Sequence, residues 1–230
     1  MVTVSTMARS SSSRDISFDT DFGSARIRWD GPRATLFLGD VESSAVDTSD
    51  PTYLEFEYMQ HMDAVVSSLW EPQERFRALH VGGAACALAC AWSASHPQSR
   101  HVAVEVDRLL ADQVREHFPI PKAPQVKIRV GDGRAVLDGA REGSFDVIVR
   151  DAFASGATPD HLRTVECADR ARRALTASGV YLVNCANGGT ANAPQDVAAL
   201  QVGSPFVAFI PDATAGRGGR RGNAVALESD

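Results

Sequence analysis

A short apolar strand runs directly into a glycine turn in the segment Ala78-Leu79-His80-Val81-Gly82-Gly83. An alanine-rich helix is expected next, over residues 84–95. Three further apolar runs each end on an acidic residue or a glycine: residues 101–104 before Glu105, 126–130 before Gly131-Asp132-Gly133, and 145–149 before Arg150-Asp151. Strand–helix alternation of this kind predicts a mainly parallel sheet with helices on both faces. Open α/β sheets bind ligands at the carboxyl ends of their strands, so the pattern predicts a nucleoside site there.

The rest of the chain divides around this core. At 230 residues, it is long enough for one α/β domain with a full core. Residues 1–20 include a run of four serines and are expected to be a disordered tail. Residues 21–50 are expected to form a small N-terminal β element of three short strands, and residues 51–230 the main domain. A helix is expected to start at Asp50-Pro51, because Asp is a favoured N-cap and Pro a favoured first helical residue.

The end of the chain indicates how the sheet closes. Two late apolar runs, residues 206–210 and 223–227, flank a loop rich in glycine and arginine and predict a closing antiparallel pair. The fold class is therefore α/β, a methyltransferase-like Rossmann sheet of seven strands, mostly parallel, with the small N-terminal β element before it. The loop at 216–222 is interpreted as a flexible hairpin loop.

Composition narrows the possible partners. The net charge is −6, which argues against a general nucleic-acid-binding surface. No apolar run approaches the roughly 20 residues of a membrane span, so no membrane association is expected. The four cysteines form no CxxC pair. They are interpreted as reduced, buried thiols in a cytoplasmic protein, rather than as disulfides or a metal site.

The first candidate binding residues are Gly82, Gly83 and Glu105. A glycine turn between strand and helix lets a ligand lie against bare backbone at a helix N-terminus, although any α/β protein can use such a tight turn. The dinucleotide fingerprint G-x-G-x-x-G is absent, which disfavours NAD. An acid at the end of the second strand can accept hydrogen bonds from ribose hydroxyls. The alternative for Glu105 is a solvated acid at a strand end.

The remaining candidates lie at the next two strand ends and on the early helix. Asp132 is suited to the adenine amino group, and the flanking Gly131 and Gly133 permit close approach; it can also cap the following helix. Asp151 is predicted to face the transferable group and to hold or deprotonate an amine, with loop capping as the alternative. Tyr58 is either a core residue or part of a substrate lid.

Taken in this order, the residues resemble those of spermidine synthases and related aminopropyltransferases, from Leu36 to about Asn184. The motifs that carry the resemblance are Glu55-Phe56-Glu57-Tyr58, Gly82-Gly83, Glu105-Val106-Asp107, Gly131-Asp132 and Asp151. The resemblance implies that Glu105 binds ribose and Asp132 binds adenine. It also implies that Asp151 serves the amine as base or anchor while Tyr58 orients it. The donor would be decarboxylated S-adenosylmethionine or S-adenosylmethionine, the acceptor a small-molecule amine, and the protein a homodimer.

The chain also departs from the family pattern. Gly-Gly-Gly-Asp-Gly stands here as Gly82-Gly83-Ala84-Ala85-Cys86, without the aspartate that holds the donor's amine. The second loop aspartate is Ala154, and two expected glutamines are Ser43 and Met59. We therefore expect aminopropyl transfer to an amine, inefficient on putrescine. One alternative is a small-molecule methyltransferase, because Ala84-Ala85 leaves room for a donor carboxylate. The other is a non-catalytic adenosyl-binding or dimeric interaction protein.

Overall fold

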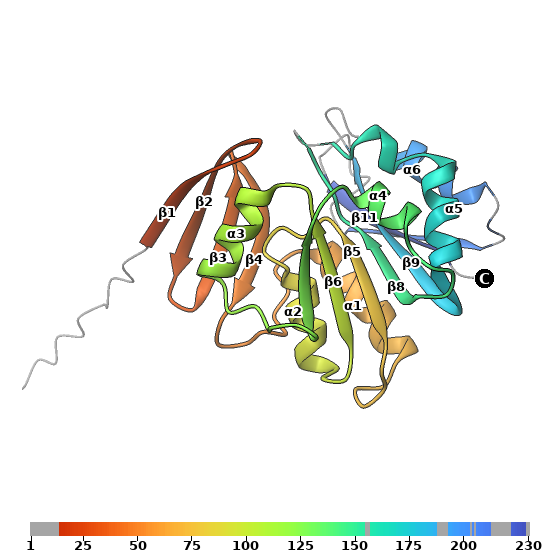
Figure 1. The fold of residues 1–230 in the computed structure, drawn as a ribbon, viewed down its shortest axis with the longest axis horizontal. Coiled ribbons are helices and arrows are strands. Elements are labelled where there is room, and N and C mark those ends of the chain that lie inside the picture. The colour runs from red at the N-terminus through yellow and green to blue at the C-terminus, as the bar shows by residue number, and fades with distance from the viewer. Residues whose placement is uncertain are drawn as a thin grey trace, which may run out of the picture.

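The computed structural model describes residues 14–154, 157–187, 193–202, 204, 206–212 and 222–228. Its N-terminal part is a four-stranded antiparallel sheet in the order β1-β2-β3-β4. Figure 1 shows this sheet at one end of the molecule, beside helix α3. The strands are β1 (Arg14–Thr20), β2 (Gly23–Asp30), β3 (Arg33–Leu38) and β4 (Val41–Asp47).

The main domain is built on a seven-stranded sheet in the order β10-β11-β9-β8-β5-β6-β7. Strands β5 to β9 are parallel to one another, whereas β10 and β11 form the antiparallel end. The seven strands and the closing antiparallel pair confirm the expected fold class. The strands are β5 (Arg77–Val81), β6 (Arg100–Glu105), β7 (Val126–Val130), β8 (Phe145–Arg150), β9 (Leu175–Asn187), β10 (Val207–Pro211) and β11 (Gly222–Glu228).

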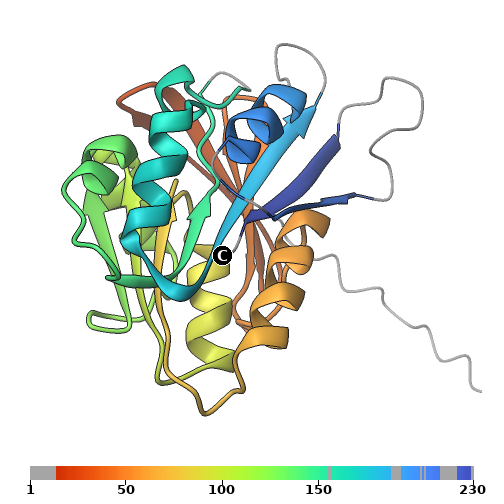
Figure 2. The same ribbon diagram turned by 90° about the vertical axis from the view of Figure 1, so that its right-hand side faces the viewer.

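Helices cover both faces of this sheet. Residues of α1 and α2 share one apolar cluster with the sheet, and residues of α4, α5 and α6 share another. Figure 2 shows the two groups on opposite sides of the strands. Helix α3 packs against the four-stranded sheet. The helices are α1 (Glu57–Leu69), α2 (Ala87–Ser95), α3 (Arg108–His117), α4 (Gly133–Asp138), α5 (Val165–Ala174) and α6 (Ala193–Gln201), with a 3₁₀ turn η1 (Asp160–Leu162).

The order of the strands places the ligand edge. From β5 the chain proceeds outward through β6 to β7, and then returns to β8 on the other side of β5. At the carboxyl ends of β5 and β8 the chain therefore leaves in opposite directions, toward β6 from β5 and toward β9 from β8. Such a switch point opens a crevice at the strand ends, where ligands of open α/β sheets bind.

Two boundaries differ from the sequence-based expectation. The tail expected over residues 1–20 is ordered from Arg14, because β1 pairs with β2 along its full length. Ile16 and Phe18 of β1 also pack on the apolar cluster under α3. Residues 1–13 lie outside the described part. The early helix begins at Glu57 rather than at Asp50-Pro51. Asp50 instead accepts hydrogen bonds from Thr52 in a local turn. Leu54 is buried in the irregular segment between this turn and the helix.

The cysteines are described as reduced thiols. All four cysteines are free, and three of them are buried while Cys90 is half-buried. Among the described residues, no helix is long and apolar enough to span a bilayer. The expected hairpin loop at 216–222 lies outside the described residues except at Gly222, where β11 begins.

A buried group of histidines fills the core between β5, β6 and α2. The Nε2 of His80 lies 3.2 Å from the Nδ1 of His101, whose Nε2 lies 2.7 Å from the hydroxyl of Ser99. The His80 ring also packs on Trp92, with 5.5 Å between ring centroids. Burial lowers the pKa of His80 to about 3. It is therefore a neutral, hydrogen-bonded core residue, as its place inside a buried strand predicts.

We predict that this histidine makes the fold acid-sensitive. The unfolded chain takes up a proton at His80 near pH 6.5 and the folded chain only near pH 3, so stability should fall as the pH drops through that window. Chemical unfolding at several pH values should show a shallower decline in His80→Gln than in the native protein. His117→Gln, at the end of α3, serves as the control. Equal slopes in all three proteins would contradict the prediction.

Candidate functional site

Backbone hydrogen bonds hold the four predicted strand ends in line. The amide of Asp151 donates to the carbonyl of Val81 at 2.8 Å, and the amide of Gly82 donates to the carbonyl of Val104 at 3.1 Å. The amide of Gly131 donates to the carbonyl of Glu105 at 2.8 Å. The residues that follow β8, β5, β6 and β7 therefore meet at one edge of the sheet. This edge is the crevice that the strand order creates.

Gly82 permits the closest contact at this edge. Its φ is +99°, and a Cβ at this position would lie 2.0 Å from the carbonyl oxygen of Asp151. Any other residue would push the backbone after β8 away from β5. Gly133, the first residue of α4, is similarly confined, because a Cβ there would lie 2.3 Å from a methyl carbon of Val81. Both glycines thus allow close packing of the segments that form the crevice.

Glu105 lies against the glycine turn. One oxygen, Oε2, accepts hydrogen bonds from the amides of Gly83 at 3.3 Å and Ala84 at 3.0 Å. The other, Oε1, accepts from the amide of Asp107 at 3.1 Å. A carboxylate has about four acceptor positions, so these three bonds leave capacity for one more donor. Glu105 is therefore more than a solvated acid, since it ties the turn to the end of β6.

Asp132 caps helix α4. Its Oδ1 accepts a hydrogen bond from the amide of Ala135 at 2.9 Å, and its Oδ2 lies 2.8 Å from the Nε2 of His161. Although burial opposes it, the bonds to Ala135 and His161 lower the pKa of the Asp132 carboxyl. The capping role that its position before a helix predicts is present. The local sequence pattern does not predict the contact with His161, because that residue follows 29 positions later.

Asp151 is held from two sides. The hydroxyl of Tyr58 on α1 donates to its Oδ2 at 2.9 Å, and the Nδ2 of Asn184 on β9 donates to its Oδ1 at 2.8 Å. Burial raises the pKa of the Asp151 carboxyl, although these two hydrogen bonds and the charge of Arg150 lower it. Tyr58 and Asp151 thus meet as one group. The sequence pattern does not predict Asn184 as a site residue, although it follows an apolar run as the other strand-end residues do.

A buried ion pair lies behind Asp151. The guanidinium of Arg150 lies 3.0 Å from Oδ2 of Asp196, and the Nε of Arg163 donates to Oδ1 of Asp196 at 2.8 Å. Arg150 also donates to the carbonyl of Leu162 at 3.0 Å. Successive side chains of a strand point to opposite faces, so Arg150 points toward α6 while Asp151 points toward α1. The ion pair fixes the end of β8 and thereby the position of Asp151.

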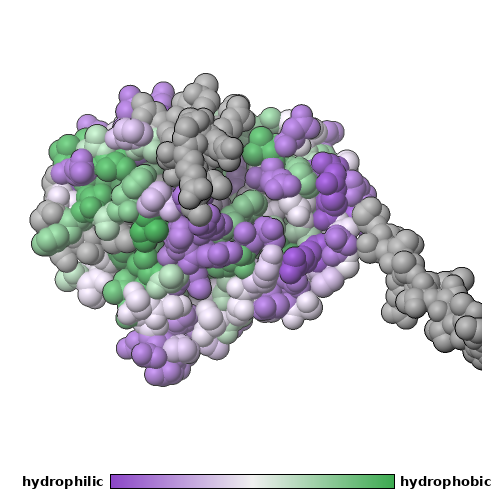
Figure 3. Space-filling view, turned by 180° about the vertical axis from the view of Figure 1, so that it is seen from behind, coloured by the Kyte–Doolittle hydropathy of each residue, from purple (hydrophilic) through white to green (hydrophobic). Residues whose placement is uncertain are grey.

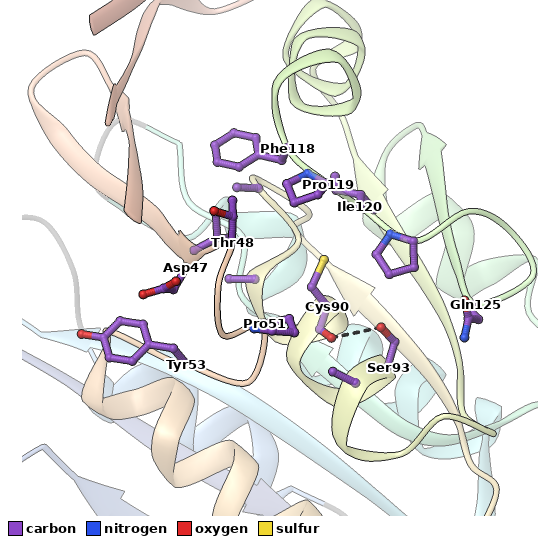
Figure 4. A pocket seen from close by; sticks show the side chains of 15 residues that line it. Asp47, Thr48, Pro51, Tyr53, Cys90, Ser93, Phe118, Pro119, Ile120 and Gln125 are labelled. Carbon is purple, nitrogen blue, oxygen red and sulfur yellow. Dashed lines mark hydrogen bonds between the residues drawn. The ribbon is translucent and has the colours of Figure 1, made fainter. Parts of the chain in front are cut away.

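A cavity of about 290 Å³ lies apart from this edge, between the end of β4, α2 and the segment after α3. Figure 4 shows Asp47, Tyr53, Cys90 and Phe118 around it. Ala85 also lines it, but the predicted catalytic and binding residues do not. Among the described residues, no group of three or more histidine, cysteine or acidic side chains is arranged to hold a metal ion.

The turn itself contains two residues in unusual conformations. Ala84 has a φ of 38° and Cys86 a φ of 57°, both in the left-handed region that favours glycine. These are two of the positions at which the family pattern has glycine. The turn thus keeps the left-handed backbone conformation at two residues that are not glycine. Each of them costs roughly 1–2 kcal/mol of folding stability.

We predict opposite effects from two substitutions in this turn. Gly82→Ala should lower the free energy of unfolding by about 2–4 kcal/mol, because its Cβ would collide with the Asp151 carbonyl. Ala84→Gly should leave it unchanged or raise it by about 1 kcal/mol, because relief of strain outweighs the added flexibility of the unfolded chain. Denaturant titrations measure both. A similar loss of unfolding free energy in the two variants would contradict the close contact at Gly82 and the strain at Ala84.

Known proteins resemble this chain in sequence or in structure. No family model matches the chain. A polyamine aminopropyltransferase from Vibrio vulnificus (strain CMCP6) is 28% identical over 119 residues, which are 50% of this chain and 39% of that protein. The aligned part is thus well under half of that relative's length.

Two solved structures superpose over nearly the whole chain. A spermidine synthase in complex with the transition state analogue AdoDATO has a TM-score of 0.69 at 18% identity, covering 94% of this chain and 73% of that one, which shows a shared fold. A probable spermidine synthase from Corynebacterium glutamicum ATCC 13032 has a TM-score of 0.85 at 33% identity, covering 93% of this chain and 79% of that one. With this identity over most of both chains, the protein belongs to the spermidine synthase-like family, whose members have the methyltransferase fold.

Proposed function

We propose that this protein is an aminopropyltransferase that binds an S-adenosyl donor at the strand edge and transfers the aminopropyl group to an amine. The observation that carries the proposal is the group formed by Tyr58, Asp151 and Asn184. It places a carboxylate of raised pKa at the end of β8, where the reacting amine of a bound acceptor would lie. A general base works best when its pKa approaches the working pH.

The donor's adenosyl part would occupy the crevice beside this group. Glu105 keeps capacity for one hydrogen bond from a ribose hydroxyl. Gly82 and Gly133 let the segments that form the crevice pack closely. Asp132 would receive the adenine amino group, in place of or alongside His161. A protein with the same fold is solved in complex with AdoDATO, which supports an S-adenosyl-type ligand for this protein.

The chemical step would be a direct displacement. A neutral amine attacks the carbon beside the sulfonium, so that a C–N bond forms while the C–S bond breaks and methylthioadenosine leaves. The attacking nitrogen then carries an extra proton, which Asp151 accepts. Tyr58 and Asn184 hold that carboxylate toward the amine, since each donates to a different oxygen. Positioning and proton transfer are thus the contributions of these three residues.

Two departures from the family pattern limit the expected substrates. Ala85, at the position of the donor-binding aspartate, is fully buried and packs with Leu110 and Val114. Ala154 replaces the second acid of the loop after β8. Each hydrogen bond lost to a charged group is worth about 1.5–3 kcal/mol. Two losses would reduce turnover by a factor of roughly 10² to 10⁴. We therefore propose that putrescine is a poor acceptor for this enzyme.

The cellular setting and assembly are also proposals. Free cysteines suit the reducing cytoplasm, where we place the protein. We propose a homodimer. Phe206 and Phe209 are 66% and 47% exposed, and Figure 3 shows hydrophobic residues gathered on the half of the molecule away from the four-stranded sheet. Exposed apolar side chains on one part of the surface support association between copies.

Product analysis by mass spectrometry tests the function. With putrescine and decarboxylated S-adenosylmethionine, we expect turnover well below about 1 s⁻¹, the lower end of the ordinary enzyme range. Asp151→Asn should lower the remaining transfer to any better amine acceptor by a factor of at least about 10². Asp160→Asn, a fully exposed site, should have no effect. A methylated product would instead indicate a methyltransferase, and no product with any donor or amine would contradict the proposal.

A further inference from the structure

The side chain of His161 links the 3₁₀ turn η1 to the acid that follows β7. Its Nε2 lies 2.8 Å from Oδ2 of Asp132, across 29 positions of the chain. A carboxylate only accepts hydrogen bonds, so Nε2 carries the hydrogen and donates it. The pKa of the Asp132 carboxyl is lowered in spite of its partial burial, through the bonds to Ala135 and His161. The pair therefore consists of an imidazole donor and an ionised acceptor.

The backbone of η1 is held in place independently of this contact. The guanidinium of Arg134 on α4 donates to the carbonyl of His161 at 3.3 Å. Arg150, which is only 3% exposed, donates to the carbonyl of Leu162 at 3.0 Å. Leu162 itself is buried in the apolar cluster that contains residues of α4 and α5. The turn is thus attached to α4 and to the end of β8, which gives the imidazole a defined place beside Asp132.

Both oxygens of Asp132 have a donor, and this fixes the plane of the carboxylate. Oδ1 accepts from the amide of Ala135 at 2.9 Å, and Oδ2 accepts from His161. A carboxylate has about four acceptor positions, so the remaining ones point in set directions. The side chains of Asp132 and His161 are 42% and 51% exposed, and a Cβ at Gly131 would meet no atom of another described segment within 4 Å. A ligand can therefore reach this carboxylate without displacing His161.

We propose that His161 determines which base the site accepts, because it holds Asp132 as an acceptor for the 6-amino group of a purine and thereby excludes a 6-oxo purine. The amide of Gly131 donates to the carbonyl of Glu105 at 2.8 Å, so this acid lies beside the proposed ribose site. An amino group at position 6 donates hydrogen bonds, whereas a 6-oxo group only accepts them and is repelled by a fixed carboxylate. His161 does not relieve this repulsion, because its Nε2 hydrogen is already donated to Asp132. The inference rests on the proposed function, because it concerns the base of the same donor.

Calorimetry on the full chain tests the inference without requiring turnover. Methylthioadenosine is titrated beside methylthioinosine, which carries a 6-oxo group in place of the 6-amino group. The native protein should bind methylthioadenosine at least about tenfold more tightly than methylthioinosine, as expected for one hydrogen bond to a charged acceptor.

Two variants of His161 separate its hydrogen bond from its packing. His161→Gln loses the ring but keeps an N–H donor, so the preference for methylthioadenosine should stay within about twofold of the native value. His161→Phe keeps a ring without a donor, so the preference should fall to about threefold or less. Because the imidazole is half-exposed, both variants should fold, which circular dichroism checks.

Two further variants serve as references. Asp160→Asn, a fully exposed site on the same turn, should leave the preference unchanged. Asp132→Asn presents an amide N–H donor in place of an acceptor oxygen, so it should reverse the preference in favour of methylthioinosine.

The possible failures are distinguishable. His161→Phe that keeps the native preference, or His161→Gln that loses as much of it as His161→Phe, would overturn the role of His161. Native protein that binds the two nucleosides equally, or Asp132→Asn that still prefers methylthioadenosine, would overturn it as well. In each of these cases binding of methylthioadenosine leaves the proposed transferase standing. If the native protein binds neither nucleoside, the proposed function fails and this inference fails with it.

Discussion

The contact between Gly82 and the backbone of Asp151 is the constraint on which the site depends. Where β5 ends, a Cβ at Gly82 would lie 2.0 Å from the Asp151 carbonyl oxygen. Because residue 82 is a glycine, the segment after β8 can cross close to the end of β5. Strands β8 and β5 can then still pair through their backbones. The same turn brings the amides of Gly83 and Ala84 to Glu105. The nucleoside crevice and the amine site are thus adjacent because two backbones meet without a side chain between them.

A second determinant of the site is that the end of β8 carries oppositely charged side chains on its two faces. Arg150 is buried on one face with Asp196, and Asp151 lies on the other face with Tyr58 and Asn184. A buried guanidinium needs an anionic partner, which α6 provides. Its charge also opposes the effect of burial on the Asp151 carboxyl. The ion pair therefore serves both the position and the ionisation of the proposed base. These are tertiary effects of helices that follow β8 in the chain.

Local patterns in the sequence predict the fold and the strand-end residues. The apolar runs that end on Gly82, Glu105, Asp132 and Asp151 form neighbouring strands, and these residues lie at one edge. The start of α1 could not be located from Asp50-Pro51, because burial of Leu54 in an irregular segment outweighs a good capping sequence.

Long-range pairs could not be predicted from local patterns. The contact of Arg150 with Asp196 and that of His61 with Asp212 join segments far apart in the chain, and nothing in the local spacing indicates them. Asn184 is a different case, since its place after an apolar run was a usable signal. An amide at a strand end is neither the acid nor the glycine that is typical of a nucleoside site, so the local pattern does not single it out.

The central claim is that this sheet edge binds an adenosyl group through Glu105. Titration calorimetry with methylthioadenosine tests it most directly, using native protein and Glu105→Ala after circular dichroism has shown that the variant is folded. We expect binding to the native protein and a loss of about 1.5–3 kcal/mol of binding free energy in the variant. Unchanged affinity in a folded Glu105→Ala variant, or no binding to the native protein, would contradict it.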